Sequence, residues 1–299
     1  MSTRLGRSGA GRADGDADDD DGTASVASAR LRLVRILVAG YAVAFCLLRL
    51  PHLLGLADYG GHRFRPVGVV ALVTDRPLPD VAWYLVVAAA VVSSAALAAG
   101  WRTRLTGPSA ALAVLAVATY RSSWGQLFHT EHLLVLHLLV LGAALALAAR
   151  DDGFVLRLLA VVTVSTYVVS AWAKLRTGGL DWISGDTLRN QIAYDNVRKE
   201  VLGAPSSPLA GLLVPHAWLF PPLAAATIAV ELGAPLALLG ERAARWWAGA
   251  VWLFHLGVAA LMAIVFAYPL SGVAFAPLLP VERLRLPRRR PGPAANADG

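Results

Sequence analysis

The sequence predicts an all-α fold, a polytopic membrane helical bundle with about seven to eight transmembrane helices. Of its 299 residues, 57% are hydrophobic and only 16% are charged, and the mean hydropathy is +0.56. Soluble domains average about 45–50% apolar and about 25% charged residues. The chain also contains a series of apolar stretches, most of them long enough to cross about 30 Å of hydrocarbon. These observations argue against a soluble enzyme.

Seven apolar stretches are predicted to span the membrane, because each approaches the roughly 20 residues that a transmembrane helix needs. The predicted spans cover residues 36–56, 81–99, 105–120, 133–149, 154–173, 217–239 and 246–268. The stretch 105–120 is the shortest and contains Pro108 near its start. A further apolar piece, residues 269–280, is too short for a straight crossing. It is predicted to be re-entrant or to belong to an eighth span.

Polar segments flank this membrane domain, which is expected to cover residues 31–285. Residues 1–30 are small, polar and Asp-rich, and they are predicted to form a disordered acidic tail without the apolar core of a cleavable signal peptide. Residues 286–299 are predicted to form a basic tail rich in Pro and Gly. Cys46 is the only cysteine, which excludes an intramolecular disulfide and a Cys-x-x-Cys metal site.

Arginine pairs set the expected orientation in the cell membrane, because loops rich in Lys and Arg stay on the cytoplasmic side. The pairs fall in alternate loops and are Arg32 and Arg35, Arg102 and Arg104, Arg150 and Arg157, and Arg242 and Arg245. The N-terminus is therefore predicted to be cytoplasmic and the long segment 174–216 to face outward. Seven spans would place the Arg-rich C-terminus outside and eight would place it inside, so eight are favoured. This bias also accounts for the net charge of +7, so the predicted partner is the lipid bilayer and not a nucleic acid.

A polar stripe on the span 154–173 marks the first candidate site. Counting back from Lys174 by four, seven and eleven residues gives Ser170, Tyr167 and Thr163, which share one face of a helix. Only Lys174 and Lys199 are lysines among the 27 basic residues. A partly desolvated amine loses its proton readily, so Lys174 is a candidate general base. The alternative is an anchor at the membrane interface, where lysines at span ends are common.

Two histidines lie at the start of the span 133–149. His129 and His132 share a helical face, with Glu131 between them. Metal sites need three or four ligands, and the other histidines are scattered, so no metal is predicted. The expected roles are interfacial hydrogen bonding or proton handling in a cavity.

Three further ionisable residues fall within predicted spans, where such groups cost roughly 2.5–3.5 kcal/mol on insertion scales and are functional candidates by default. Arg49, in the outer half of the first span, is expected either to reach the interface or to form a buried ion pair. Glu231 and His255 lie near the middle of their spans. They are interpreted first as a structural pair that bridges two helices.

The order of these motifs resembles a known family. The run Y-V-V-S-A-W-A-K-L-R-T-G-G-L-D-W-I-S-G at residues 167–185 looks like the vitamin K-dependent gamma-carboxylase pattern, in which a span ends in Y-x-x-A/S-G-x-x-K-L and continues to D-W-x-x-G. The segments S-S-W-G-Q-L-F-H-T-E-H-L-L, from Ser122, and W-L-F-H-L-G, from Trp252, resemble two other segments of that family. Over roughly residues 30–285 the sequence is similar to the horizontally transferred transmembrane domain that bacteria share with the carboxylase.

This resemblance implies a cofactor and roles for individual residues. It places Lys174 on the lysine that deprotonates reduced vitamin K, and His132 and His255 on two histidines of the family. Trp182 matches the tryptophan of the D-W-x-x-G motif. The implied catalytic residues are Lys174 and His132, and the implied contacts of a reduced menaquinone or vitamin K hydroquinone are Tyr167, Ser170, His255 and Trp182. The implied activity is a quinone-dependent carboxylation, or a related oxidation, at the outer membrane face.

Departures from the family leave the acceptor substrate open. Glu131 stands where the family has an asparagine, and the sequence holds no counterpart of the large extramembrane domain that binds the family's peptide substrate. The acceptor is therefore expected to be an unidentified small molecule, lipid or peptide.

Two other functional classes also stay open. One is a quinone-linked redox subunit similar to the DoxX-like membrane proteins, which a redox-active cysteine pair would favour. The other is a non-catalytic transporter or scaffold, in which Lys174 only anchors the helix and Lys174→Arg is silent.

Overall fold

The computed structural model describes residues 13–284, with side chains from residue 24 onward, and this part of the chain is helical without any strand. Its α-helices are α1 Ala13–Leu48, α2 Leu50–Gly55, α3 Asp80–Ala99, α4 Thr103–Ser122, α5 His132–Ala146, α6 Asp152–Gly178, α7 Asp186–Val201, α8 Pro208–Leu213, α9 Phe220–Leu232, α10 Glu241–Met262 and α11 Ala267–Leu270. Short 3-10 helices occur at Leu56–Asp58, Gly61–Arg63, Gly68–Leu72, Gly179–Trp182 (η4), Ala217–Leu219, Ala234–Leu239 (η6), Val273–Leu278 (η7) and Val281–Arg283 (η8). The prediction of an all-helical fold is confirmed for the described residues.

Three helices of the described chain are long and apolar enough to cross a membrane, which is fewer than the seven to eight predicted. They are Ala24–Leu48, Asp80–Ala99 and Asp152–Trp182. Each predicted span overlaps a helix, but α5 and α9 have only 15 and 13 residues. Helices α4 and α10 include charged residues such as Arg104 and Arg245, which lower their hydropathy. Three apolar helices fit a membrane protein.

Helix α1 begins earlier than the sequence suggested. Residues 13–30, expected to belong to a disordered tail, are helical, so that prediction is wrong for them. A helix that is already nucleated extends at low cost. Residues 1–12 and the predicted tail 286–299 lie outside the described residues.

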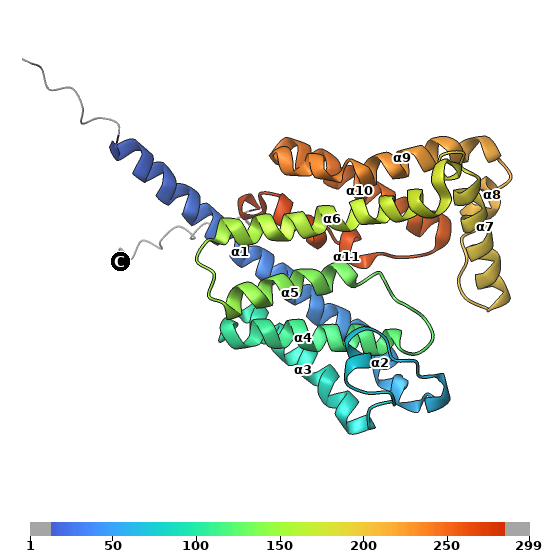
Figure 1. Ribbon diagram of the computed structural model, residues 1–299, viewed down its shortest axis with the longest axis horizontal. Helices are drawn as coiled ribbons and strands as arrows, with labels where there is room; N and C mark the ends of the chain where they lie inside the picture. The colour runs from blue at the N-terminus through green and yellow to red at the C-terminus, as the bar shows by residue number, and fades with distance from the viewer. Residues whose placement is uncertain (1–12, 285–299) are drawn as a thin grey trace, which may run out of the picture.

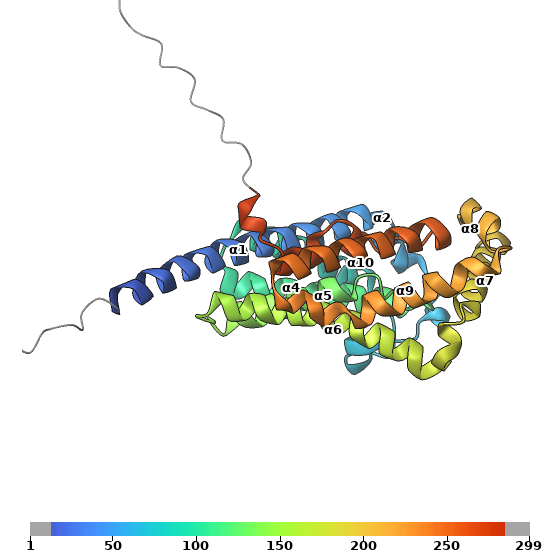
Figure 2. The same ribbon diagram turned by 90° about the horizontal axis from the view of Figure 1, so that it is seen from above.

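Helix α1 runs between two groups of helices, with α3, α4 and α5 in one group and α6, α9 and α10 in the other (Figure 1). In the view turned by 90°, the long helices α1, α6 and α10 follow broadly the same direction (Figure 2). Helices α4 and α5 approach closely where Gly107 meets Gly142, since a Cβ on Gly142 would lie 3.0 Å from the carbonyl oxygen of Gly107. Small residues at such positions let two helix backbones approach closely. Helices α7 and α8 lie across one end of the bundle (Figure 1).

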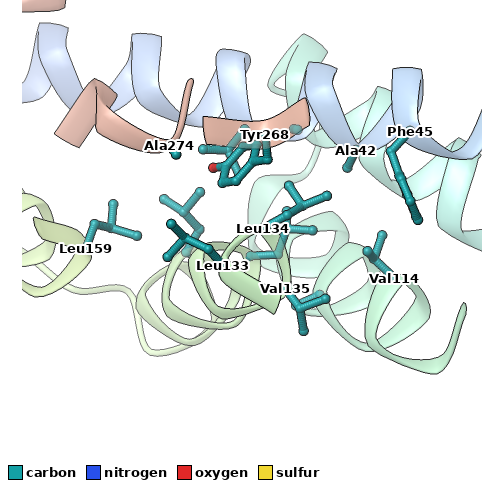
Figure 3. Close-up of a cluster of buried hydrophobic side chains, with 14 of the residues drawn as sticks. Ala42, Phe45, Val114, Leu133, Leu134, Val135, Leu159, Tyr268 and Ala274 are labelled. Atoms are coloured by element: carbon teal, nitrogen blue, oxygen red, sulfur yellow. The ribbon is translucent and has the colours of Figure 1, made fainter. Parts of the chain in front are cut away.

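After α10 the chain turns back through the interior of the bundle. Ala263, with a φ of +48°, ends α10, and residues 264–284 return through α11, η7 and η8. Tyr268 and Phe275 of this returning segment are buried. Figure 3 shows Tyr268 and Ala274 packed among core side chains of the neighbouring helices. Irregular backbone at membrane depth is tolerated where protein surrounds it, and the returning segment meets that condition.

Charged residues join the beginning of the apolar part of α1 to the end of the returning segment. Arg30 donates two hydrogen bonds of 2.8 Å to the carboxylate of Glu282. Arg283 binds Glu241, at the start of α10, with nitrogen–oxygen distances of 2.9 and 3.1 Å. We call this end of the bundle the terminal end. The chain thus returns to the end from which α1 starts, as an eighth crossing would require.

The arginine pairs of the predicted cytoplasmic loops also lie at the terminal end. Arg32 and Arg35 share a surface depression with Asp152 at the start of α6. The Arg35 guanidinium lies against Gly100, which is followed closely by the pair Arg102 and Arg104. The pair Arg150 and Arg157 lies around the start of α6, and Arg242 and Arg245 follow Glu241. The predicted grouping of these four pairs is therefore found in the fold.

A buried hydrogen-bonded network holds the returning segment to two other helices. His137 of α5 is fully buried, with Nδ1 2.7 Å from the Tyr268 hydroxyl and Nε2 2.9 Å from the Thr163 hydroxyl of α6. The Tyr41 ring of α1 packs against Tyr268, with the ring centroids 4.8 Å apart. Because buried polar groups need partners, this network fixes how the segment fits between α5 and α6.

Candidate active site

The polar stripe predicted on α6 does face the interior. Asp151 caps the helix by accepting a hydrogen bond from the Phe154 amide, and the helix continues to Gly178, so residues four apart stay on one face. Tyr167 is buried, Ser170 is half-buried, and the Lys174 side chain is 20% exposed. The stripe therefore carries polar atoms from the middle of the bundle towards the end that bears α7.

Lys174 forms an ion pair with Glu231 in the last turn of α9. Its Nζ lies 2.6 and 2.7 Å from the two carboxylate oxygens, and it also donates to the Ser170 hydroxyl over 2.7 Å. Ser170 in turn donates to Oε1 of Glu231 over 3.1 Å. The Glu231 side chain is only 2% exposed. The three residues thus form a closed ring of hydrogen bonds between α6 and α9.

This ion pair corrects two interpretations of the sequence. Glu231 does not pair with His255, because its carboxylate is taken by Lys174, and His255 Nε2 instead lies 2.9 Å from the Tyr167 hydroxyl. Lys174 is not an anchor that reaches out to the membrane interface, because it points to a buried carboxylate. A buried carboxylate needs a cation, and Lys174 is the lysine nearest to the predicted spans. The need of the Glu231 carboxylate for a cation could therefore have indicated this ion pair from the sequence, whereas the positions of Glu231 and His255 within their spans suggested that these two residues pair with each other.

A cavity of about 450 Å³ opens beside the ion pair, within the range of roughly 300–1,000 Å³ that is usual for small-molecule sites. Five of the six predicted site residues line it, namely Lys174, His132, Tyr167, Ser170 and His255. Glu231 and Gln191 line it as well; Glu231 was interpreted first as a structural residue, and Gln191 was not singled out. Apolar walls come from Phe254, Val258, Phe266 and Pro269. The cavity thus combines a few polar groups with a largely apolar surface.

One polar atom beside this cavity is unused. His255 is 4% exposed, and its Nδ1 has no hydrogen-bond partner among the described residues. The ring is held on its other side by Tyr167, and it packs against Phe266 with centroids 4.9 Å apart. A buried polar atom without a partner is unfavourable, so His255 is ready to accept or donate one hydrogen bond to a molecule in the cavity.

Two histidines, His129 just before α5 and His132 at its first residue, lie at the edge of the cavity. His129 and His132 are both exposed and both line it, and the His129 ring lies 5.4 Å from that of Phe266. They do not contact Lys174 in the structure. Among the described residues, no group of three or more His, Cys, Asp or Glu residues is arranged to hold a metal ion.

Glu131, between these histidines, belongs to a separate charged group. Its buried carboxylate lies 3.2 Å from Arg49 and 3.2 Å from Arg121. Of the two roles expected for Arg49, the structure therefore has the ion pair. Arg121 is 4% exposed and stacks 3.4 Å from the centre of the Phe128 ring. This group connects the end of α1 with the end of α4 and the start of α5.

Trp182 is the predicted site residue that does not line the cavity. It is buried in η4, and the Lys174 Nζ lies 5.7 Å from the centre of its ring. Gly185, which completes the D-W-x-x-G motif, has a φ of +86°, and a Cβ there would lie 2.4 Å from the backbone of Phe220 and Pro221. This part of the motif therefore supports the lysine and brings α7 against the start of α9.

The described chain is thus an all-helical protein with helices able to cross a membrane and with a buried ion pair beside an internal cavity. No family model matches the sequence, and comparisons with curated proteins and with solved structures find no match either.

Proposed function

We propose that the chain is a multi-pass protein of the cell membrane in which the returning segment completes an eighth crossing. Its N-terminus would be cytoplasmic, and the cavity would open towards the outer face. Two observations support this topology. The four arginine pairs lie together at the terminal end, where positive-inside loops belong, and the C-terminal end of the returning segment lies beside Arg30.

We propose further that the cavity is the site of a quinone-dependent enzyme related to the horizontally transferred transmembrane domain and the gamma-carboxylase family. The single observation that carries this proposal is the convergence of five motif residues on one cavity. Lys174, His132, Tyr167, Ser170 and His255 come from three helices that are separated in the sequence.

The residues of the cavity fit a reduced menaquinone or vitamin K hydroquinone. Such a molecule has an apolar ring with two polar oxygen atoms, and the cavity offers apolar walls together with two separate polar groups. The unpartnered Nδ1 of His255 can bond one oxygen atom, and the ion pair of Lys174 and Glu231 can bond the other. When bound, the reduced quinone would supply two weakly acidic hydroxyl groups and two electrons.

The chain's own residues would bind, orient and move a proton. Tyr167 fixes the plane of the His255 ring through the bond to Nε2, which leaves Nδ1 without a partner among the described residues. The ring of Lys174, Ser170 and Glu231 holds a cation and a proton acceptor in one place. Phe254 and Phe266 place apolar rings beside this region, and water displaced by a bound molecule would strengthen the electrostatic interactions within it. The acceptor substrate, a small molecule, lipid or peptide, would reach the site past His129 and His132.

The experiment that tests this function is an assay of quinone epoxide formation by the purified protein. It supplies reduced menaquinone or vitamin K, oxygen and labelled bicarbonate. Wild-type protein is expected to form epoxide, and Lys174→Ala is expected to lose nearly all of it. Lys199→Ala is the matched control, because it removes the other lysine, whose side chain does not line the cavity. Folded wild-type protein that binds quinone but forms no epoxide would refute the enzymatic proposal.

One observation favours a non-catalytic scaffold as the second function. The ion pair of Lys174 and Glu231 joins α6 to α9, and a purely structural pair would have the same geometry. In that case Lys174→Arg would preserve the fold, and ligand binding in the cavity would be absent in the wild type as well.

A further inference from the structure

The hydrogen bonds around Lys174 show which proton positions are occupied. An ammonium group has three donors and no acceptor. Lys174 Nζ makes three contacts, with the Ser170 hydroxyl and with both carboxylate oxygens of Glu231. The Ser170 hydroxyl donates its own hydrogen to Glu231, so it must accept from Lys174. In the ammonium form the three hydrogens of Lys174 serve these three contacts, and no lone pair of this nitrogen remains to face the cavity.

Glu231, in contrast, keeps an acceptor position. An ionised carboxylate offers about four lone-pair positions on its two oxygens. Oε1 accepts from Ser170 and from Lys174, whereas Oε2 accepts only from Lys174 among the described residues. The residue lines the cavity and its side chain is 2% exposed. The free lone pair of Oε2 is thus the unused basic position of the ion pair.

We infer that Glu231 is the proton acceptor of the site and that Lys174 remains an ammonium ion throughout. This inference rests on the proposed function, because it names the base that acts on a hydroxyl group of the bound molecule. In the step, the O–H bond of that hydroxyl breaks and its proton moves to Oε2 of Glu231. The two bonding electrons stay on the oxygen that the proton leaves. Lys174 then faces that oxygen in place of the carboxylate.

Conservation of charge in the buried site supports this assignment. Before the step, one ammonium faces one carboxylate. After it, the same ammonium faces one new anion, and Glu231 is neutral, so the net charge stays at zero. If Lys174 were the neutral base, Glu231 would have to lose its cation or take up a proton beforehand. A Glu231 carboxylate without its cation would be an isolated buried charge, which is strongly unfavourable. If Glu231 instead takes up a proton beforehand, it is again the first proton acceptor of the site.

The charge of Lys174 can be measured directly, because the chain has only two lysines, Lys174 and Lys199. Protein with ¹⁵N at the lysine side-chain nitrogens gives two signals in nuclear magnetic resonance, and Lys199→Arg assigns them. We expect three hydrogens on the Lys174 nitrogen, both without ligand and with a bound menaquinone, at neutral pH. Two hydrogens on this nitrogen in the ligand-free protein would overturn the inference.

The proton on Glu231 can be detected by infrared difference spectroscopy. Addition of reduced menaquinone to the wild type is expected to produce the carbonyl band of a protonated carboxylic acid. The band should be absent in Glu231→Gln, shifted in Glu231→Asp and retained in Lys174→Arg. Glu231→Asp also covers the case in which Glu231→Gln fails to fold, since it keeps the charge.

The outcomes separate this inference from the proposed function. If the wild type shows neither a band nor any effect of quinone on the lysine signals, quinone does not bind, and the proposed function fails together with the assignment. If the wild type forms epoxide while Glu231→Gln keeps the band or at least half of the rate, the enzyme stands and Glu231 is not its acceptor. Lys174→Arg is expected to retain a measurable rate of epoxide formation. Complete loss in Lys174→Arg with an unchanged rate in Glu231→Asp and Glu231→Gln would identify Lys174 as the base.

Discussion

Lys174 Nζ lies 2.6 and 2.7 Å from the two carboxylate oxygens of Glu231, although the residues are 57 positions apart in the sequence. The contact joins the end of α6 to the end of α9 in a place that is shielded from water. It determines both the electrostatics of the cavity and the packing of these two helices.

Lys174→Met is expected to lower the free energy of unfolding by about 3–5 kcal/mol, because it leaves the Glu231 carboxylate buried without a cation. The double variant Lys174→Met and Glu231→Gln is expected to regain most of this loss, since no charge then remains. Unfolding of the purified protein in detergent measures both. Equal stability of the two variants would show that the carboxylate is not desolvated.

Gly185→Ala is expected to prevent stable folding, because its Cβ would lie 2.4 Å from the backbone of Phe220 and Pro221. Gly203→Ala is the matched control. Gly203 also has a positive φ, of +69°, but no atom lies within 4 Å of the position of its Cβ. The control should lose only about 1–2 kcal/mol for the left-handed backbone. Yield and thermal unfolding after purification distinguish the two variants, and similar values for both would contradict the close approach of α7 to α9.

Tyr268→Phe is expected to destabilise the protein by about 1–3 kcal/mol, because Nδ1 of the buried His137 loses its partner. Tyr194→Phe serves as control, since Tyr194 is 72% exposed. Thermal unfolding of both variants gives the difference. A Tyr268→Phe protein as stable as the control would mean that another group satisfies His137.

Acidification is expected to release the terminal end. The hydrogen bonds from Arg30 hold the pKa of Glu282 below its usual value of 4.5. The folded state therefore binds this proton less readily than the unfolded state. The contribution of Glu282 to the free energy of unfolding is complete above about pH 4.5. It decreases as the pH falls below that value, and it disappears below the lowered pKa of the folded state.

Thermal unfolding as a function of pH tests this expectation. In Glu282→Gln the decrease below pH 4.5 should be smaller than in the wild type, and the stability at neutral pH should be lower. Asp75→Asn is the control, because the Asp75 side chain is 89% exposed. An unchanged pH profile in Glu282→Gln would show that the pair with Arg30 does not contribute.

Periodicity predicted the parts of the fold that depend on neighbours along one helix. The stripe of Thr163, Tyr167, Ser170 and Lys174 follows from spacing alone, and the structure confirms that it faces inward. The positions of the seven predicted spans also match helices, because apolar runs must be helical in such an environment. Three of the described helices are long and apolar enough to cross a membrane, fewer than predicted, since several of the others are short or carry charges.

Contacts between helices could not be derived in the same way. Glu231 and His255 are both ionisable and both near mid-span, which made a mutual pair plausible, but the rotation of α9 and α10 assigns them to Lys174 and to Tyr167. Helix rotation depends on the packing of all neighbouring side chains. The same applies to Gln191, which reaches the cavity only because α7 lies across the end of the bundle.

The returning segment also has a consequence for how the protein is made. Proteins are synthesised from the N-terminus, so Tyr268 and Phe275, which fill the centre of the bundle, emerge after every long helix. Until then, His137 can bind the Thr163 hydroxyl but lacks the Tyr268 hydroxyl as its second partner. Helices α1, α5 and α6 are complete early, but they reach their final packing only when the end of the described chain has left the ribosome. A stop codon just after α10 would leave them around an unfilled centre.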